Sequence, residues 1–357
     1  MKVHPQQLVS GCLITKDVMG QTLTPLIPKH TVVEPIHLQV LNKFRVYEVE
    51  VANKLVNGES FEAEKKIDQP DKEQQDDPIS FYEHYVEVVK QTKAMFEGFD
   101  YRSKIDIQKI RQLIYPLVEQ GENKLDVLLK LYHYNDPNNY FYYHIVSMPV
   151  IATFLAKKLG YSEKDRLNIA LAAFLSDIGM LKDQEGLYLL DRSLTHAEYE
   201  QVRKHPIESY RMIEDLPVHK DVKISVLQHH ERLDGSGYPM GVQNDKIHPF
   251  ASIIAISDMF HAMTSERIYR QKQSPYKVVE EMTKDYIDKL DMKVLNQIVN
   301  TIVNFSNGTQ VKLSNNDYGT IVFTDEKHPT RPYVRLSKNK EIINLIDERD
   351  LYIDEVL

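Results

Sequence analysis

Cysteine and long apolar runs are scarce in this sequence of 357 residues. Its single cysteine cannot form an intrachain disulfide, so a disulfide-stapled fold and dithiol redox chemistry are excluded. We expect Cys12 to be a small buried apolar residue. The longest apolar runs, such as 169–175 and 250–256, are far shorter than the roughly 20 residues of a membrane-spanning helix. The N-terminus lacks the apolar segment of a signal peptide. A cytoplasmic protein without a membrane partner is therefore expected.

Clustered positive charge is also missing. The 44 lysines and arginines are outnumbered by 52 aspartates and glutamates, which leaves a net charge of -8. No dense Lys/Arg block of the kind that follows a phosphate backbone is present, so polymeric nucleic acid is not an expected partner. Hydrophobic residues at 42% and charged residues at 27% are ordinary values for a soluble globular protein. A chain with this composition is expected to fold.

The length predicts more than one domain, because single domains usually have about 100 to 200 residues. Residues 1–56 alternate short β-prone runs, at 12–15, 26–28 and 45–51, with turn signals and one short helical stretch at 36–44. This pattern predicts a small β-rich N-terminal domain of mixed α/β type.

A linker and a helical region follow. Residues 57–78 are polar and acidic with few aliphatic side chains, the composition of a solvated linker. From 79 to 306 the apolar residues recur with helical spacing, which predicts a helical bundle. Within it, helices are predicted to begin after Thr195, Ser274 and Asp291, because each precedes a stretch with helical periodicity and has a capping side chain.

The last part of the chain changes pattern again. Residues 307–357 contain β-prone runs at 311–313, 320–323, 333–336 and 342–346, separated by turn segments. We expect a small β-barrel-like C-terminal domain.

Histidines and aspartates spread through the helical region are candidate metal ligands. Imidazole and carboxylate suit Fe, Mn or Zn, and one aspartate can bridge two ions with its two oxygens. A single histidine on a helix is more often packed or solvated than a ligand, so the local context decides. The candidates are His144, Asp177, His205, His229, His230 and Asp258.

The most informative context is the string HHERLDGSGYP at 229–239. Two adjacent histidines at the end of a helix project about 100° apart, so both can reach one cluster. Gly235 and Gly237 let the following backbone approach a bound phosphate closely. This string resembles the signature of the HD-GYP family of bacterial cyclic di-GMP phosphodiesterases, which act in second-messenger signalling.

The resemblance extends from about Tyr140 to Pro275. It implies a mainly α fold, in which a multi-helix HD-type metal phosphohydrolase bundle is flanked by the small N-terminal and C-terminal domains. It also implies divalent metal ions, one or two per chain. One ion would be bound by Asp177, His205, His229 and His230, and the other by His144, Asp177 and Asp258 together with the histidine of the HD pair.

That last histidine is missing. Where the family has HDIGK, this chain has Ser176, Asp177, Ile178, Gly179 and Met180. A hydroxyl is a poor ligand beside imidazole, so the second ion is expected to bind more weakly. Met180 replaces a lysine that lies near the substrate phosphate in the family, so a charge that neutralises the anion is absent.

Two further departures surround this site. His261 stands three residues after Asp258, where the family usually has a second aspartate, and lies on the same helix face. It either lends an imidazole to the depleted site or is a histidine packed beside it. Tyr140 stands where some members of the family have a glutamate for a third metal, which leaves at most two ions.

For substrate contacts, the resemblance implies that Gly237, Tyr238 and Pro239 border the pocket. It also implies that Arg267 and Arg270 supply charge to the phosphates, for which the planar guanidinium is well suited. Without the resemblance, the two arginines would be read as exposed residues that follow a helix.

The activity implied is metal-dependent hydrolysis of cyclic di-GMP to pGpG or GMP, reduced by Ser176 and Met180, with Asp177 as the central residue. The alternative is a catalytically inactive module that binds cyclic di-GMP or metal and signals through its flanking domains. An HD-type nucleotidase with other substrates is a third hypothesis, which the GYP loop disfavours. The roles of residues 1–56 and 307–357, a homodimer and the identity of the metal stay open.

Overall fold

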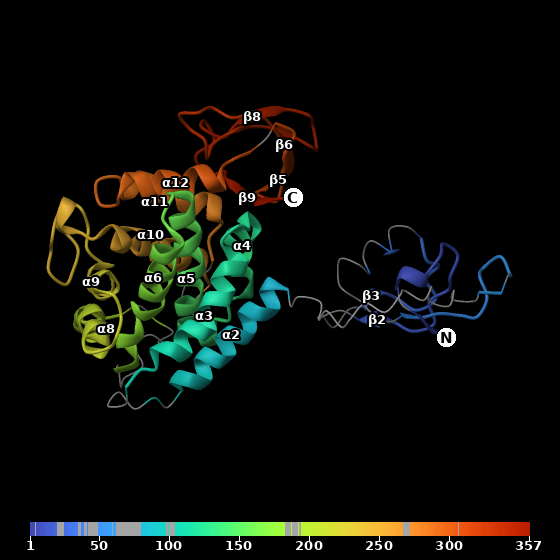
Figure 1. Cartoon of the computed structure of the whole chain (residues 1–357). Helices are drawn as coiled ribbons and strands as arrows, with labels where there is room; N and C mark the ends of the chain where they lie inside the picture. Colours follow the sequence, from blue (N-terminus) through green and yellow to red (C-terminus); the bar gives the residue numbers. More distant parts are fainter. Residues whose placement is uncertain are drawn as a thin grey trace. The chain divides into compact units, whose positions relative to one another are not determined.

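The computed structural model describes residues 1–3, 5–19, 25–34, 37–38, 41, 49–58, 60–61, 80–97, 99, 104–182, 187, 192, 194–266, 272–305 and 307–357. The chain divides into two compact units, Met1–Pro78 and Ile79–Leu357 (Figure 1). No helix in the described ranges is long and apolar enough to cross a membrane. The division into four parts expected above stays a prediction, since the helices and the C-terminal strands form one compact unit.

In the described residues of the N-terminal unit, short strands form two antiparallel pairs. Strand β1 (Lys2–Val3) pairs with β4 (Val49–Glu50), and β2 (Val18–Met19) pairs with β3 (Pro25–Ile27). Cys12 is fully buried in the small apolar core of this unit, as expected. Most of the helical stretch expected at 36–44, and most of the linker at 57–78, lie outside the described residues.

The second unit is mainly helical, which confirms the mainly α part of the predicted fold class. Its α-helices are α2 (Phe81–Phe96), α3 (Ile107–Gly121), α4 (Leu125–Lys130), α5 (Tyr140–Lys158), α6 (Glu163–Leu175), α7 (His196–Val202), α8 (His205–Ile213), α9 (Lys220–Gln228), α10 (Pro249–Thr264), α11 (Pro275–Asp285) and α12 (Met292–Ile302). Short 3-10 segments, η2 (Leu131–Tyr134), η3 (Pro137–Asn139), η4 (Ile178–Lys182) and η6 (Asn244–Lys246), connect some of them.

The predicted helix starts are confirmed. The Thr195 side chain accepts from the backbone N–H of Glu198, whose own side chain accepts from the N–H of Thr195 in a capping box. Ser274 caps α11 and Asp291 caps α12 through bonds to the first-turn N–H groups. Such caps stabilise a helix by about 1 kcal/mol each, because they satisfy donors that the helix itself leaves open.

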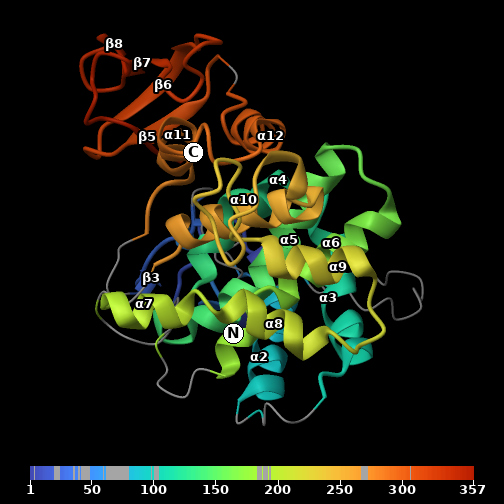
Figure 2. The ribbon, with the colours of Figure 1, turned by 90° about the vertical axis from the view of Figure 1, so that its left-hand side faces the viewer.

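Helix α5 lies at the centre of the bundle. It contacts α2, α3, α6, α10 and α12, and it lies among the green and cyan helices in Figures 1 and 2. Nearly every side chain from Phe141 to Ala156 is buried, as expected for a helix that is apolar on all sides. His144 is therefore surrounded by protein, and its ring has little freedom to turn.

The segment that follows α6 packs closely against α8. The Ser209 hydroxyl donates to the Ser176 carbonyl at 2.6 Å and accepts from the Gly179 N–H at 2.8 Å. A Cβ atom on Gly179 would lie 2.6 Å from the backbone nitrogen of Ser209 and closer still to the carbonyl oxygen of His205. Only glycine fits there, and its approach brings the segment after α6 against the start of α8.

An antiparallel sheet follows the helices. Its strands, in the order β8-β7-β6-β5-β9, are β8 (Ile342–Asn344), β7 (Tyr333–Leu336), β6 (Tyr318–Phe323), β5 (Gln310–Leu313) and β9 (Ile353–Val356). The sequence predicted four of these strands and missed β9. The barrel-like closure stays a prediction. Arg331 bonds Glu280 of α11, and the Ser274 hydroxyl donates to the Ile353 carbonyl at 2.8 Å, so the sheet packs on α11.

Replacement of Gly179 tests the close packing of the segment after α6 against α8. Gly179→Ala should lower the free energy of unfolding by about 2 kcal/mol, because the added methyl group overpacks the backbone of α8. Gly160→Ala is the matched control, since Gly160 has a φ of +83° but nothing within 4 Å of the added Cβ. It should cost only about 1 kcal/mol through the left-handed backbone. Urea unfolding measures both, and equal losses in the two variants would contradict the steric argument.

Candidate metal centre

The six candidate ligands come from five segments that the fold brings together. His144 lies on α5, Asp177 follows α6, and His205 is the first residue of α8. His229 and His230 follow α9, and Asp258 lies on α10. Ligand atoms of four of them lie within 4.8 Å of one another: Asp177, His205, His229 and His230.

The rings of His205 and His229 are oriented by the backbone. His205 Nδ1 lies 2.8 Å from the Val202 carbonyl, and His229 Nδ1 lies 2.7 Å from the Val226 carbonyl. Since a carbonyl only accepts, each Nδ1 carries a proton, and Nε2 is the nitrogen of each ring that is left to face the cluster. The two Nε2 atoms are 3.1 Å apart, and that of His205 is 3.1 Å from Asp177 Oδ1.

Asp177 reaches a second group of ligands with its other oxygen. His144 Nε2 lies 3.1 Å from Asp177 Oδ2 and 3.2 Å from Asp258 Oδ1. His230 Nδ1 lies 3.7 Å from Asp258 Oδ2. Asp177 is thus shared between two groups of side chains, as a bridging ligand would be.

The charges of the cluster match those that metal ligands need. Burial raises the pKa of Asp177, but contacts with His144, His205 and His229 outweigh burial and lower the pKa well below its ordinary value. Burial, together with neighbouring His229 and His205, lowers the pKa of His230 well below the ordinary value. The carboxylate is therefore ionised and this imidazole neutral, as cation binding requires.

His144 differs from His230 in its protonation. Burial lowers its pKa, but Tyr140 and the carboxylates of Asp177 and Asp258 outweigh burial and raise it well above the ordinary value. The buried Asp177 Oδ2 has no well-aligned hydrogen-bond donor among the described residues, although His144 Nε2 is close. The imidazole nitrogens and carboxylate oxygens that converge here are donor types that fit one or two divalent cations, which would take the place of the proton on His144.

Ser176 takes no part in this convergence. Its side chain is fully buried, and its hydroxyl donates to the Ala172 carbonyl one turn earlier at 2.8 Å. The hydroxyl oxygen is thus directed along α6, as serines in helices often are. His261 does not replace it as a ligand in this arrangement. Its Nδ1 lies 2.8 Å from His144 Nδ1, the ring nitrogen on the far side from the two carboxylates.

The GYP loop covers His230. The Tyr238 ring stacks on the His230 ring with centroids 4.6 Å apart, and the Tyr238 N–H donates to the His230 carbonyl at 3.1 Å. A Cβ on Gly237 would lie 2.5 Å from the Cα of Glu231, so this approach requires glycine. Pro239 follows Tyr238 through a cis peptide bond.

The sequence did not identify the side chain that holds this loop. Glu231 is 3% exposed, and its carboxylate accepts from the N–H groups of Met240 at 2.7 Å and Val242 at 3.1 Å. The sequence does contain a signal for this role, because Glu231 is an acidic residue between the histidine pair and the glycines of the string. Arg267 and Arg270, the expected phosphate contacts, lie outside the described residues.

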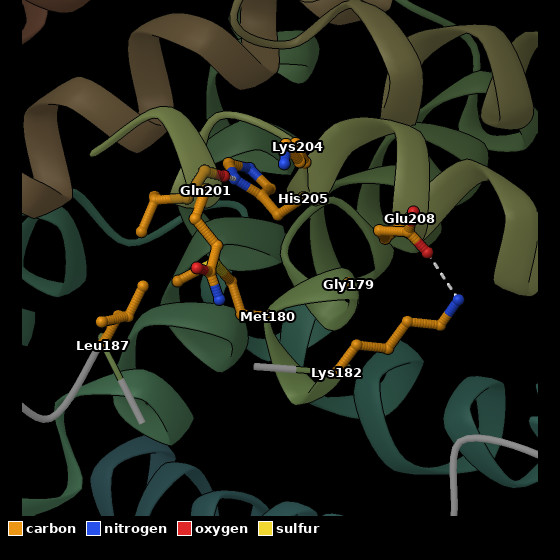
Figure 3. A pocket seen from close by; sticks show the side chains of 9 residues that line it. Gly179, Met180, Lys182, Leu187, Gln201, Lys204, His205 and Glu208 are labelled. Atoms are coloured by element: carbon orange, nitrogen blue, oxygen red, sulfur yellow. Dashed lines mark hydrogen bonds and ion pairs between the residues drawn. The ribbon is translucent and has the colours of Figure 1, made fainter. Parts of the chain in front are cut away.

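A cavity of about 300 Å³ borders His205. Met180, Leu187 and Gln201 line it from one side in Figure 3, and Met180 presents a thioether where a lysine was expected from the family pattern. Lys182, at another part of the wall, is paired with Glu208 at 2.6 Å. The wall of this cavity therefore combines apolar side chains, such as Met180 and Leu187, with polar and charged ones, including Lys204.

Comparisons with known proteins support the resemblance to HD-type phosphodiesterases. The HD domain family matches residues 133–294. The chain is 28% identical over 207 residues to cyclic di-GMP phosphodiesterase PdeB of Borreliella burgdorferi, which aligns 58% of this chain with 55% of PdeB. It is 34% identical over 127 residues to 3'3'-cGAMP-specific phosphodiesterase 3 of Vibrio cholerae, with 36% of this chain and 28% of that protein covered.

A solved structure supports the fold. The protein Bd1817, an HDG"Y"P protein from Bdellovibrio bacteriovorus, matches with a TM-score of 0.52 at 15% identity and covers 85% of this chain and 99% of its own. The chain spans little more than half the length of PdeB. Residues 133–294 thus match the HD domain family, and the shared helical fold and the HHERLDGSGYP string support the resemblance of this part of the chain to the HD-GYP family, with serine in place of the histidine of the HD pair.

Proposed function

We propose that this protein is a metal-dependent phosphodiesterase that hydrolyses a cyclic dinucleotide, cyclic di-GMP, to pGpG or GMP. The observation that carries the proposal is the position of Asp177, whose Oδ1 faces His205 and His229 and whose Oδ2 faces His144. Such sharing is what a two-metal phosphodiesterase requires of its bridging ligand. The activities named for PdeB and for the Vibrio cholerae relative support hydrolysis of cyclic dinucleotides as a class.

We propose two ion positions. Asp177, His205, His229 and His230 would bind one ion, which we call the four-ligand site. His144, Asp177 and Asp258 would bind the other, which we call the His144 site. Bound divalent ions would supply Lewis acidity and positive charge for the phosphodiester. Fe, Mn and Zn all accept such nitrogen and oxygen donors.

The chain's own groups prepare this site in three ways. The carbonyls of Val202 and Val226 hold the rings of His205 and His229 in the tautomer that leaves Nε2 free. Tyr238 covers His230 and reduces the access of water to that ring. The segment Gly237–Pro239 borders the site on that side, and we propose that it contacts the substrate, with Arg267 and Arg270 binding the phosphates.

A module that binds a cyclic dinucleotide without hydrolysing it is the second candidate. The observation in its favour is that the Ser176 hydroxyl is bonded to Ala172 and that Met180 carries no charge. The His144 site is then left with three protein ligands, and one cation for the phosphates is absent. The two candidates differ in turnover and not in binding.

Metal analysis with a turnover assay separates them. In protein purified without oxygen or chelators, we expect about two ions per chain and formation of pGpG from cyclic di-GMP. Asp177→Asn should bind less than one ion and lose turnover by at least about 100-fold, since it weakens both sites. Tight binding of cyclic di-GMP without product, with either Mn or Fe supplied, would refute the enzyme. Preferred hydrolysis of 3'3'-cGAMP in a substrate panel would refute the choice of cyclic di-GMP but not the class.

The substitutions that depart from the family pattern can be reversed. Ser176→His with Met180→Lys should tighten the second ion about 10-fold and raise turnover, because it adds an imidazole ligand and a cation. Ser176→Ala is the control, since it removes the hydroxyl without adding a donor and should leave metal affinity unchanged. Calorimetric metal titration and initial rates measure both effects. An unchanged rate in the double variant would show that these two positions do not limit activity.

Metal binding should depend on pH through His144. Its folded-state pKa lies well above the ordinary value, where burial is outweighed by Tyr140, Asp177 and Asp258. Below that pKa the metal-free ring is protonated, and an ion must displace the proton. Affinity at the His144 site should therefore rise as the pH is raised towards this pKa and fall as it is lowered. Calorimetry in buffers of different ionisation enthalpy counts the protons released, and His144→Ala should release fewer. Affinity that is independent of pH would contradict this assignment.

A further inference from the structure

His261 is a buried histidine that belongs to neither of the two proposed sets of metal ligands. It is 1% exposed and lies on α10, one turn after Asp258. A buried imidazole nitrogen without a hydrogen-bond partner would lower the stability of the fold by about 1 to 3 kcal/mol. The contacts of the His261 ring are therefore informative. They lead in two directions, to His144 and to Ser265.

The shortest contact joins two imidazoles. His261 Nδ1 lies 2.8 Å from His144 Nδ1, with ring centroids 4.9 Å apart. One of these nitrogens must donate and the other accept. The Ser265 hydroxyl oxygen lies 3.2 Å from His261 Nε2 and 3.3 Å from His261 Nδ1, and it also accepts from the side-chain amide of Asn135.

The nitrogen of His144 that faces the carboxylates determines which atom donates in these hydrogen bonds. Its Nε2 faces the carboxylates of Asp177 and Asp258, so an ion at that position requires a lone pair on Nε2. In the neutral ring the proton is then on Nδ1, which donates to His261 Nδ1. The proton of His261 is consequently on Nε2, which donates to Ser265. Tyr140 is a weaker alternative acceptor, with its hydroxyl oxygen 3.2 Å from His144 Nδ1.

We propose that His261, supported by Ser265, is a positioning residue that holds His144 in the tautomer and orientation required to bind an ion through Nε2. Metal-bound histidines usually donate their second N–H to a carboxylate or a backbone carbonyl, as His205 and His229 do here. His144 lies inside the apolar helix α5 and uses another imidazole instead. The role rests on the His144 site of the proposed function, and it differs from that of a replacement ligand for the missing histidine.

This arrangement has a consequence for the depleted site. With Ser176 directed towards Ala172, the His144 site has three protein ligands, so each must be well oriented for the ion to be retained. The acceptor at His261 is therefore expected to matter more here than in a site with four ligands.

Two substitutions at His261 test the proposal. His261→Leu removes the acceptor, and His261→Asn retains one, because the amide oxygen of asparagine occupies nearly the position of Nδ1. In zinc titrations of the full-length protein, His261→Leu should weaken the ion at the His144 site by about 10- to 100-fold, and His261→Asn should restore most of this loss. Both variants should bind the ion of the four-ligand site as the natural protein does.

Nitrogen-15 NMR of the zinc-loaded protein gives a readout that does not depend on activity. The natural protein and His261→Asn should show a slowly exchanging Nδ1–H of His144, and His261→Leu should lose it. Tyr140→Phe should retain that signal, since the tyrosine is the weaker acceptor. His248→Leu, at the N-cap of the same helix, is the matched control and should change stability without changing zinc affinity.

Three results would overturn the proposal. The first is an unchanged zinc affinity in His261→Leu. The second is an equal loss of affinity at both sites, which would indicate a merely structural role. The third is a His261→Asn variant that folds but does not restore the affinity. Ser265→Ala serves as a second variant if His261→Leu does not fold, and it should give a smaller loss of the same kind. A natural protein that binds zinc in this way but hydrolyses no cyclic dinucleotide would refute the proposed function and leave the role of His261 intact.

Discussion

A buried carboxylate is the group on which the arrangement of the helical unit depends. Asp177 lies between α6 and η4 with only 12% of its side chain exposed, and a charge at such a depth is costly unless other charges or dipoles surround it. Histidines from α5, α8 and the end of α9 meet this requirement. The same arrangement fits a cation, because imidazole nitrogens and carboxylate oxygens converge on a common point.

The backbone prepares this arrangement before any ion is bound. The carbonyls of Val202 and Val226 fix two of the rings, and the close packing at Gly179 places the start of α8 beside Asp177. The GYP loop is held in a similar way, through the buried carboxylate of Glu231 and the two backbone N–H groups that it accepts. Preorganisation of this kind lowers the free-energy cost of assembling a metal centre, since few side chains must be reoriented.

Three departures from the HD-GYP pattern lie close to the cluster. The four residues proposed for one ion all converge, whereas the Ser176 hydroxyl is bonded to Ala172 and Met180 presents a thioether to the cavity beside His205. His261 is bonded to His144 instead of to a carboxylate ligand. Ser176 and His261 bear on the proposed His144 site, so a change in metal affinity there is the expected effect, with the helical fold preserved.

Much of the local structure followed from the sequence, because local chemistry determines it. Side chains at Thr195, Ser274 and Asp291 cap the helices that they were predicted to begin, and the β-prone runs after residue 307 correspond to β5 to β8. Strand β9 was missed. It pairs with β5 from a distant part of the chain, and such pairing is a tertiary contact that a short window of sequence does not contain.

For the candidate site, the sequence by itself determined the identity of the six candidate ligands and the glycines of the loop, since recurring motifs record which residue types are present. Only the tertiary structure decided which way the side chains point. It directs the Ser176 hydroxyl to Ala172 and His261 to the far nitrogen of His144, and it uses Glu231 to hold the loop. The physical reason is that hydrogen-bond direction depends on the packing of α5, α6 and α10 against one another, which the order of residues along any one helix does not reveal.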